Sequence, residues 1–481
     1  MTPDPPVAST ANCRIARWIT WWRAPEAGSS VEAMSDQQSE TVRQVGQDGT
    51  LIRALGTWGL TAAIVNVTIG AGIFRLPASV ATTLGAAAPA AYLVCALAMG
   101  LIVLCFAEAG SRVSMTGGPY AYVEVAFGPF VGFLSGTLLW AGITAALAAV
   151  TSFFADSLAA LVPALAPSGV KVVVMLVVLA ALALLNVRGV RDASRFNAVM
   201  TVAKVLPLAI VVVIGAFAIQ SANLSWHEVP SVARVGRAST VLIFAFLGVE
   251  AALVPSGEVK DPARTVPRAV LLSIGIVAVL YVSVQIVSQG VLGASLAVSK
   301  TPVADAGGAA LGDWGRTLIL VGSTVSMFGY VSGMTLAVPR MLFAFARDGF
   351  LPRAVASIHP TFRTPYWAIG LQTVIVAVLA ATGTFERLAI VANGSVLLVY
   401  AACCLATVEL RRRDVRAGGV PFRVPGAALF PWLALVVIIS LLATLQLGEW
   451  VGVLAVLVAA APVYVVTRSR RGAPAAAAVG D

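Results

Sequence analysis

The chain has little charge for its length. Asp, Glu, Lys and Arg make up 11% of its 481 residues, whereas a typical soluble domain is about 25% charged. So few charges cannot cover a water-soluble surface, which excludes a soluble enzyme, a nucleic-acid-binding domain and a disordered chain. Hydrophobic residues make up 59% of the sequence. The composition therefore predicts an integral membrane protein that has the lipid bilayer, and no nucleic acid, as a partner.

Histidine and cysteine are also scarce. The two histidines, His227 and His359, lie in polar stretches, so an intramembrane histidine–metal site is excluded. The five cysteines are an odd number and four of them lie within apolar runs, which argues against a disulfide framework. The sequence has no nucleophile motif and no phosphate-binding loop, so neither a membrane-embedded enzyme nor an ATP-driven pump is indicated. We expect neither a metal nor a cofactor.

Long apolar runs are the main feature that is present. A helix needs about 20 mostly apolar residues to cross the hydrocarbon core, and these runs are too long for barrel strands of about ten residues. Two runs carry one charge each, Lys204 and Glu250. The sequence therefore predicts an all-α polytopic membrane protein with twelve transmembrane helices. The runs are Ala54–Phe74, Leu76–Ala107, Val125–Ala155, Val172–Val187, Phe196–Trp226, Ala238–Gly257, Ala269–Ser299, Thr317–Pro339, Thr364–Phe385, Leu388–Val408, Val424–Gly448 and Trp450–Thr467.

The basic residues predict the direction of these spans. If the N-terminus is inside, the cytoplasmic segments hold 24 of the 32 Lys and Arg residues, and the opposite loops hold six. Positively charged loops stay on the cytoplasmic side during membrane insertion. We therefore expect a multi-pass plasma-membrane protein with both termini in the cytoplasm.

The predicted organisation has four parts. Residues 1–50 are polar and are expected to form a disordered cytoplasmic tail. Met34 precedes a polar lead-in and is an alternative translation start. Residues 51–410 would hold helices 1–10, residues 411–467 would hold helices 11 and 12, and residues 468–481 would form a second disordered tail.

Glycine interrupts two of the spans near their centres. The first contains Gly-Ala-Gly at 70–72, and the sixth contains Gly248 followed by Glu250. In lipid a broken helix is tolerated only where a cavity or protein satisfies the freed backbone groups, although close helix packing also uses such small residues. Breaks in spans one and six predict a five-plus-five inverted repeat, about 51–226 and 233–410, followed by two extra helices.

The two breaks indicate the chemistry of the ligand between them. Freed N–H groups at the start of a half-helix favour an anion, and freed carbonyls at the end of a half-helix favour a cation. A zwitterionic amino acid carries both charges on one carbon. A polyamine has no carboxylate to place at the amides of the first break, so an amino acid fits the pair of breaks better.

Four motifs in this chain resemble the amino acid–polyamine–organocation (APC) transporters. The resemblance extends from about Thr57 to Arg413. It implies the leucine-transporter-like fold and secondary active transport of amino acids by alternating access, and some members of this group carry polyamines. The motifs are Gly70-Ala71-Gly72-Ile73-Phe74 with Pro77; Gly117-Gly118-Pro119-Tyr120-Ala121-Tyr122 with Phe127-Gly128-Pro129; Phe246-Leu247-Gly248-Val249-Glu250 with Glu258-Val259-Lys260-Asp261-Pro262 and Pro267-Arg268-Ala269; and Ala346-Arg347-Asp348-Gly349-Phe350-Leu351-Pro352.

Carried over by position, this resemblance places the substrate between the breaks. Amides of the first break would receive its carboxylate, and carbonyls of the second its ammonium. Some arginine exchangers of the group have Trp where Phe244 and Met334 stand here; the loss of these cation–π surfaces favours a neutral, apolar or small amino acid. Polyamines and other organic amines are the alternative. The implied substrate contacts are Thr68, Gly70, Ala71, Gly72, Phe244, Leu247 and Met334.

Two charged residues lie next to the breaks. An arginine at the membrane midplane costs roughly 3 kcal/mol or more unless it is paired or hydrated. Arg75 therefore lines an aqueous vestibule, pairs with an acidic group, or binds an anionic substrate, which would make the protein an acidic amino acid transporter. For Glu250 we expect a role in gating, by latching or hydrating the closed site, with a structural hydrogen bond to a neighbouring helix as the alternative.

Lys204, in the fifth span, is one of only four lysines. In some members of the resembled group a lysine at this position replaces a sodium ion, which implies sodium-independent transport. Protonated Lys204 would brace the carbonyls freed at the first break, and its deprotonation would release them, with proton coupling or exchange left open. The alternative is a lysine that snorkels to the cytoplasmic surface. The sequence gives no indication of the oligomeric state.

Overall fold

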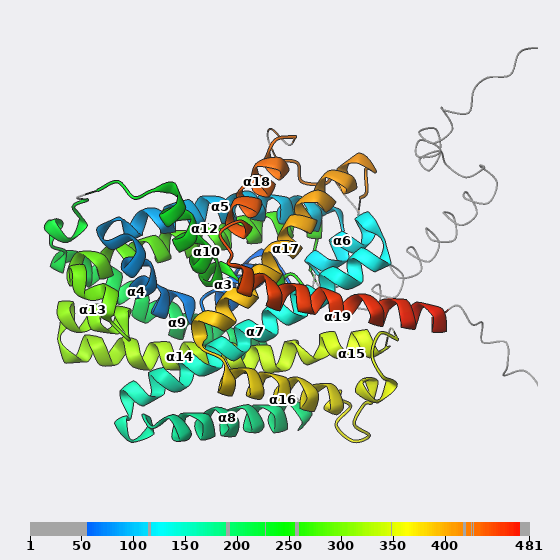
Figure 1. The fold of residues 1–481 in the computed structure, drawn as a ribbon, viewed down its shortest axis with the longest axis horizontal. Coiled ribbons are helices and arrows are strands. Elements are labelled where there is room, and N and C mark those ends of the chain that lie inside the picture. The colour runs from blue at the N-terminus through cyan, green and yellow to red at the C-terminus, as the bar shows by residue number, and fades with distance from the viewer. Residues whose placement is uncertain are drawn as a thin grey trace, which may run out of the picture. The chain divides into compact units, whose positions relative to one another are not determined.

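The fold of the chain, taken from a computed structural model, consists of helices throughout the described residues, apart from one isolated bridge between Leu55 and Val259 (Figure 1). The expected N-terminal tail and the alternative start at Met34 lie outside the described residues. The last helix continues to Arg471, past the boundary expected at residue 467. The described residues are 55–113, 117–188, 193–226, 228–254, 259–347, 349–416, 420–424, 426 and 428–471.

The helices follow one another with short connections. The α-helices are α3 (Thr57–Thr68), α4 (Gly72–Leu84), α5 (Ala88–Arg112), α6 (Pro119–Phe127), α7 (Pro129–Leu161), α8 (Ser168–Arg188), α9 (Ala193–Gly215), α10 (Val232–Phe246), α11 (Val249–Ala252), α12 (Pro262–Leu292), α13 (Pro302–Leu311), α14 (Asp313–Ala337), α15 (Pro339–Arg347), α16 (Tyr366–Thr382), α17 (Phe385–Arg412), α18 (Phe430–Leu442) and α19 (Leu447–Arg471). The 3₁₀ helices are η2 (Gly85–Ala87), η3 (Pro163–Leu165), η4 (Ala216–Ala218), η5 (Ser221–Leu224), η7 (Gly293–Val298) and η8 (Arg353–Ala356).

Proline and glycine set several of these boundaries. Pro119, Pro129 and Pro262 stand in the first turns of α6, α7 and α12, where a missing N–H costs nothing and the fixed φ suits a helix. Gly128, with a φ of 87°, ends α6 and begins the connection to α7. The Gly-Pro pair in the sequence therefore separates a short helix from a long one.

Many of the helices are long and apolar enough to cross a membrane. Within the described residues, eight segments meet this condition, and three shorter apolar helices lie at Tyr366–Thr382, Phe430–Leu442 and Trp450–Val465. Each of the twelve predicted apolar runs overlaps at least one α-helix. The shorter helices arise because proline delays their start: α16 follows Pro365, and α18 has proline in its first turn. The chain is a polytopic membrane protein.

The contacts between helices show a repeat. For each pair of helices in contact named here, the helices of the predicted spans five places away from them in the order are also in contact. Helix α7 packs against α17, as α14 packs against α9. Helix α3 packs against α9, as α10 packs against α17, and α12 contacts α3 and α9 as α5 contacts α10 and α17. Helices α8 and α16 contact each other and run side by side in Figure 1.

The last turns of α10 lie in the middle of the hydrophobic core. Ile243, Phe244, Ala245 and Phe246 are all buried, although they point to different sides of the helix. Helix α10 contacts α4, α5, α17 and α18. A helix that is apolar on all sides is one that is surrounded by protein or lipid. The sixth span is therefore enclosed by the other helices at the point where it breaks.

Candidate functional site

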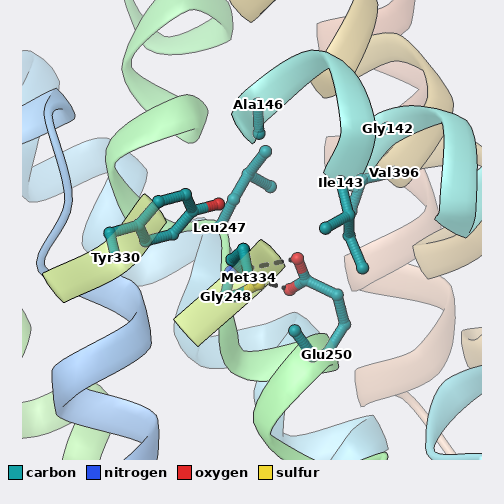
Figure 2. A pocket seen from close by; sticks show the side chains of 10 residues that line it. Gly142, Ile143, Ala146, Leu247, Gly248, Glu250, Tyr330, Met334 and Val396 are labelled. Carbon is teal, nitrogen blue, oxygen red and sulfur yellow. Dashed lines mark hydrogen bonds between the residues drawn. The ribbon is translucent and has the colours of Figure 1, made fainter. Parts of the chain in front are cut away.

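The sixth predicted span is broken at Gly248. Helix α10 ends at Phe246 and α11 begins at Val249, and Gly248 between them has a φ of 126°. The Gly248 N–H donates to both carboxylate oxygens of Glu250, at 3.0 Å each (Figure 2). The Tyr400 hydroxyl donates to Oε2 of the same carboxylate at 2.6 Å. Because Glu250 is only 1% exposed, its carboxylate caps the start of α11 inside the protein and connects it to α17.

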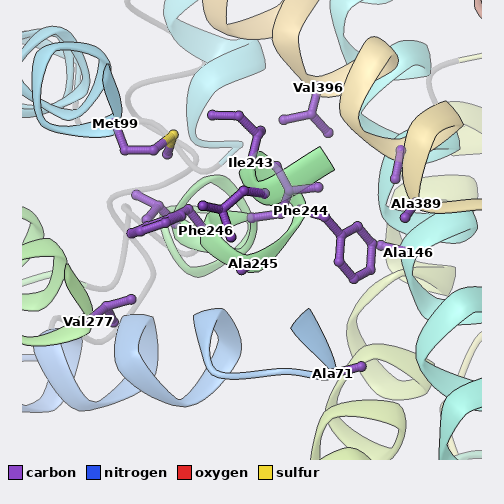
Figure 3. Close-up of a cluster of buried hydrophobic side chains, with 14 of the residues drawn as sticks. Ala71, Met99, Ala146, Ile243, Phe244, Ala245, Phe246, Val277, Ala389 and Val396 are labelled. Carbon is purple, nitrogen blue, oxygen red and sulfur yellow. The ribbon is translucent and has the colours of Figure 1, made fainter. Parts of the chain in front are cut away.

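The first predicted span is broken between Thr68, where α3 ends, and Gly72, where α4 begins. Ile69 has a ψ of 85°, and the connection to Ala71 is drawn as a thin tube in Figure 3. Among the described residues, the N–H groups of Ala71, Gly72 and Ile73 have no hydrogen-bond acceptor. Three successive free donors at a helix start suit an anion such as a carboxylate.

The two breaks pack against each other through glycine. A Cβ atom at Gly72 would lie 2.6 Å from Cα of Ala245, in the last turn of α10. A Cβ atom at Gly248 would lie 2.9 Å from the carbonyl carbon of Val67 and 3.0 Å from the nitrogen of Thr68, in the last turn of α3. Only glycine allows these backbones to approach so closely. At Gly72 the structure thus shows the close helix packing that the sequence left open.

Side chains from other helices hold the carbonyl groups at the end of α3. The Lys204 ammonium, on α9, donates to the carbonyl oxygen of Asn66 at 2.8 Å. The Tyr281 hydroxyl, on α12, donates to the carbonyl oxygen of Thr68 at 3.0 Å. Lys204 is 1% exposed, which is incompatible with snorkelling to the membrane surface. The lysine is therefore directed at the first break.

A small cavity lies beside the second break (Figure 2). It has room for about one water molecule. Its walls come from α7, α14, α17 and the break between α10 and α11, and they are apolar except for Glu250 and the Tyr330 hydroxyl. The lining residues are Gly142, Ile143, Ala146, Leu247, Gly248, Glu250, Ala251, Tyr330, Met334 and Val396.

The predicted substrate contacts divide between the cavity and the surrounding core. Leu247 and Met334 line the cavity. Phe244 packs edge to face on Phe385, with ring centroids 5.3 Å apart, and is not among the described lining residues. The Thr68 hydroxyl is buried and has no hydrogen-bond partner among the described residues.

The ring of Tyr330 lies between the first break and the cavity. A Cβ atom at Gly70 would lie 3.7 Å from Cδ2 of Tyr330, which is an ordinary van der Waals contact, while the hydroxyl end of the ring faces the cavity in Figure 2. Gly70, Ala71 and Gly72 are therefore not cavity walls themselves. Tyr330 connects the two halves of the candidate site.

The sequence model of the amino acid permease family matches residues 55–467. This chain belongs to the amino acid permease family. The resemblance to the APC transporters is thereby confirmed, and the protein is a transporter and not an enzyme.

Characterised relatives of the permease cover most of its length. The methylthioribose transporter of Bacillus subtilis (strain 168) is 29% identical over 82% of this chain and 88% of its own. The branched-chain amino acid permease BcaP of the same organism is 28% identical over 85% of this chain and 91% of its own. The serine/threonine exchanger SteT of Bacillus subtilis (strain 168) is 27% identical over 82% of this chain and 90% of its own length. The family match, over residues 55–467, includes both breaks.

Arg75 of the permease forms an ion pair. Its Nη2 lies 3.2 Å from Oε1 of Glu386, in the first turn of α17, and its Nη1 donates to the carbonyl oxygen of Lys300 at 3.1 Å. The two paired side chains are 31% and 50% exposed. Arg75 thus has the geometry of the paired alternative, and it does not belong to the described cavity walls.

A buried charge cluster joins α5 to the end of α17. Glu108 and Arg112 have fully buried side chains, and Nη2 of Arg112 lies 3.0 Å from Oε1 of Glu108. Nη2 of Arg411 lies 2.7 Å from Oε2 of the same carboxylate. Arg112 also donates to the carbonyl oxygen of Val415 at 3.3 Å. This network fixes the segment that follows α17 against α5.

Three tyrosines of the permease site could not be found from the sequence motifs. Tyr281, Tyr330 and Tyr400 lie on α12, α14 and α17, and each hydroxyl faces one of the two breaks or the cavity. The available signal was a tyrosine within an apolar run. That signal does not show which way the hydroxyl points.

Proposed function

We propose that the permease is a secondary active transporter of neutral amino acids, which crosses the plasma membrane with both termini in the cytoplasm and works by alternating access. The observation that carries this proposal is the pairing of three free N–H donors at the first break with an apolar cavity at the second. The donors suit a carboxylate, and the apolar walls suit an uncharged side chain. The basic residues of the predicted cytoplasmic segments support the orientation.

The charges around the site favour a neutral substrate over the alternatives. A polyamine or another organic amine would need a carboxylate that is available to it, whereas the Glu250 carboxylate is committed to Gly248 and Tyr400. An acidic amino acid would need a free cation, but Arg75 is paired with Glu386. The described cavity walls hold no cation, and their one carboxylate caps α11.

The relatives support the same substrate class. By their names, BcaP carries branched-chain amino acids and SteT exchanges serine and threonine. These substrates are neutral amino acids of modest size. Methylthioribose, the substrate in the name of a third relative, is also uncharged.

The architecture that we propose is twelve transmembrane helices in a leucine-transporter-like fold, with a five-plus-five inverted repeat and two extra helices. The exchange of helix contacts between spans five places apart supports it. The two breaks support it as well, because the glycine after each break packs on the half-helix before the other. Such reciprocal contacts are what a pseudo-two-fold axis between two inverted halves produces.

We propose that Lys204 takes the place of a coupling cation. Its ammonium lies 2.8 Å from the Asn66 carbonyl oxygen, so a positive charge is already present where the end of α3 exposes carbonyl groups. Transport is then independent of sodium. Loss of the Lys204 proton releases α3, which links gating to proton coupling or to exchange.

The test is uptake into proteoliposomes of a labelled panel of the twenty amino acids plus putrescine, at two pH values, with and without Na⁺. We expect uptake of neutral amino acids with no sodium requirement. Uptake of putrescine alone, of glutamate and aspartate alone, or of no amino acid at all would contradict the proposed substrate class.

A further inference from the structure

One polar side chain in the wall of the cavity beside the second break makes no hydrogen bond within the described residues. Of the described lining residues, only Glu250 and Tyr330 carry a polar oxygen in the side chain. Glu250 is engaged by Gly248 and Tyr400. The Tyr330 hydroxyl has no hydrogen-bond partner among the described residues, and it faces the cavity in Figure 2.

Tyr330 is half-buried, and its hydroxyl opens on the cavity, so only a molecule that enters the cavity can give this oxygen a hydrogen-bond partner. Phenylalanine would fill the same volume without an oxygen at this wall. The position of Tyr330 within the core contact network, with its ring against Gly70, does not require the oxygen. The hydroxyl is therefore explained by a polar group that enters the cavity, which means a group of the transported molecule.

The size of the cavity limits what that group can be. The space holds about one water molecule, and the walls next to it include Gly142, Ala146 and Ala251. Helix α7 is already close to α17 at this point, because a Cβ atom at Gly142 would lie 2.7 Å from Cγ2 of Val396. A group of the size of water, with the ability to donate and accept a hydrogen bond, is a side-chain hydroxyl.

We propose that Tyr330 is a specificity-determining residue, and that its hydroxyl binds the side-chain hydroxyl of a small neutral amino acid of the serine and threonine class. This inference rests on the proposed function and deepens it. The amino acid head group binds at the amides of the first break. The hydroxyl of its side chain occupies the cavity, where it donates to or accepts from Tyr330.

Threonine and valine provide the test because they have nearly the same shape and differ by the hydroxyl. A site built to bind a substrate hydroxyl rejects the analogue that lacks it, because a buried polar group is then left unpaired. The measurement is inhibition of labelled amino acid uptake by threonine and by valine in proteoliposomes. We expect the unchanged permease to prefer threonine by about tenfold or more, which corresponds to one net hydrogen bond.

The variant Tyr330→Phe removes the oxygen and keeps the ring. It should reduce the preference for threonine to near unity by weakening threonine, while valine binds at least as tightly as before because no hydroxyl is then left unpaired. The matched control is Tyr92→Phe. Tyr92 is also a buried tyrosine whose hydroxyl has no partner among the described residues, but it lies on α5 and is not a described cavity wall. This control should keep the preference.

Thermal unfolding of the purified protein gives a second readout that does not depend on turnover. A ligand that binds the folded state more tightly raises the unfolding midpoint further. Threonine should therefore raise the midpoint of the unchanged permease more than valine does. In Tyr330→Phe the two amino acids should raise the midpoint equally. Three outcomes would overturn the inference while leaving neutral amino acid transport intact. In Tyr330→Phe, both ligands could bind equally more weakly, or the preference for threonine could be unchanged. The third outcome is that the unchanged permease shows no preference. A permease that takes up no amino acid overturns the proposed function itself.

Discussion

The backbone of Gly248 lies so close to that of Thr68 that a Cβ atom on the glycine would come within 3.0 Å of the threonine nitrogen. Gly72 stands in the corresponding relation to Ala245. Each break therefore forms part of the wall that supports the other break. Neither half-helix can shift toward its neighbour, and any added side chain at these two glycines pushes the breaks apart.

The first prediction compares two glycines of the first break. Gly72→Ala should lower the free energy of unfolding by about 1–3 kcal/mol, because its methyl group would overlap the backbone of α10. Gly70→Ala should change stability by less than about 0.5 kcal/mol, because its methyl group would be in ordinary contact with Tyr330. Thermal unfolding in detergent measures both. Equal destabilisation by the two variants would show that the breaks do not pack as described.

The second prediction concerns Lys204. Replacement by Met removes the charge that holds the Asn66 carbonyl, so uptake should fall by about tenfold or more, in line with the loss of a buried charged hydrogen bond. The control is Lys171→Met, because Lys171 is a partly exposed lysine paired with Asp156. This variant should leave uptake unchanged. Unchanged uptake by Lys204→Met at every pH, or an absolute sodium requirement of the unchanged permease, would contradict the proposed role.

The third prediction concerns Glu250. Glu250→Gln weakens the hydrogen bonds to Gly248 and Tyr400 without touching the amides of the first break. We expect kcat to fall by about tenfold and KM to change by less than about twofold, the pattern of a residue that acts on a conformational step. Tyr400→Phe should shift kcat in the same direction. Lost affinity with normal turnover would instead identify Glu250 as a direct substrate ligand.

The fourth prediction tests the substrate charge through Arg75. Because its guanidinium is paired with the Glu386 carboxylate and donates to the carbonyl oxygen of Lys300, Arg75→Gln should leave the order of preference among amino acids unchanged. An exposed ion pair of this kind contributes about 0–1 kcal/mol, so stability should change little. Competition by glutamate and by neutral amino acids measures the order. A loss of glutamate transport in the variant would favour the acidic alternative.

The fifth prediction concerns the charge cluster at the end of α17. Glu108→Gln leaves the fully buried Arg112 with only the more distant carboxylate of Asp414, 4.0 Å away, which should cost about 3 kcal/mol of stability. Glu409→Gln is the matched control, because Glu409 pairs with the exposed Arg412 and Arg413 and should cost at most about 1 kcal/mol. The difference between their unfolding midpoints is the measured quantity.

Much of the fold was predictable because the membrane constrains the sequence directly. Apolar runs must be helical where no water is present to bond the backbone, and each predicted run overlaps a helix. The breaks were predicted from glycines near the centres of spans one and six, but glycine alone does not decide, because α7 continues through Gly136 and Gly142. Where the helices are short, as in α16 and α18, proline moved the boundary inward from the end of the apolar run.

The arrangement of the site was less predictable because it depends on contacts between distant segments. Phe244 lies against Phe385, a contact that no local pattern indicates, and its role as a substrate wall stays a prediction. The family resemblance led us to expect Lys204 at the carbonyls of the first break, where it donates to Asn66, but its position in the sequence alone also allowed snorkelling to the membrane surface. The roles of Tyr330 and Tyr400 depend on the direction of their hydroxyl groups, and hydropathy carries no information on that direction.

The contacts between the two breaks also bear on how the protein is made. Gly72 meets Ala245, and Gly248 meets Thr68, across pairs that are far apart along the chain. When the first span leaves the ribosome and enters the bilayer, the helix that will pack against Gly72 has not yet been synthesised, and the free amides beside this glycine are exposed to lipid. Until then the N–H groups of the first break need other hydrogen-bond partners, either within a continuous helix or in the insertion machinery. Docking of the sixth span then completes both breaks in a single late step of assembly.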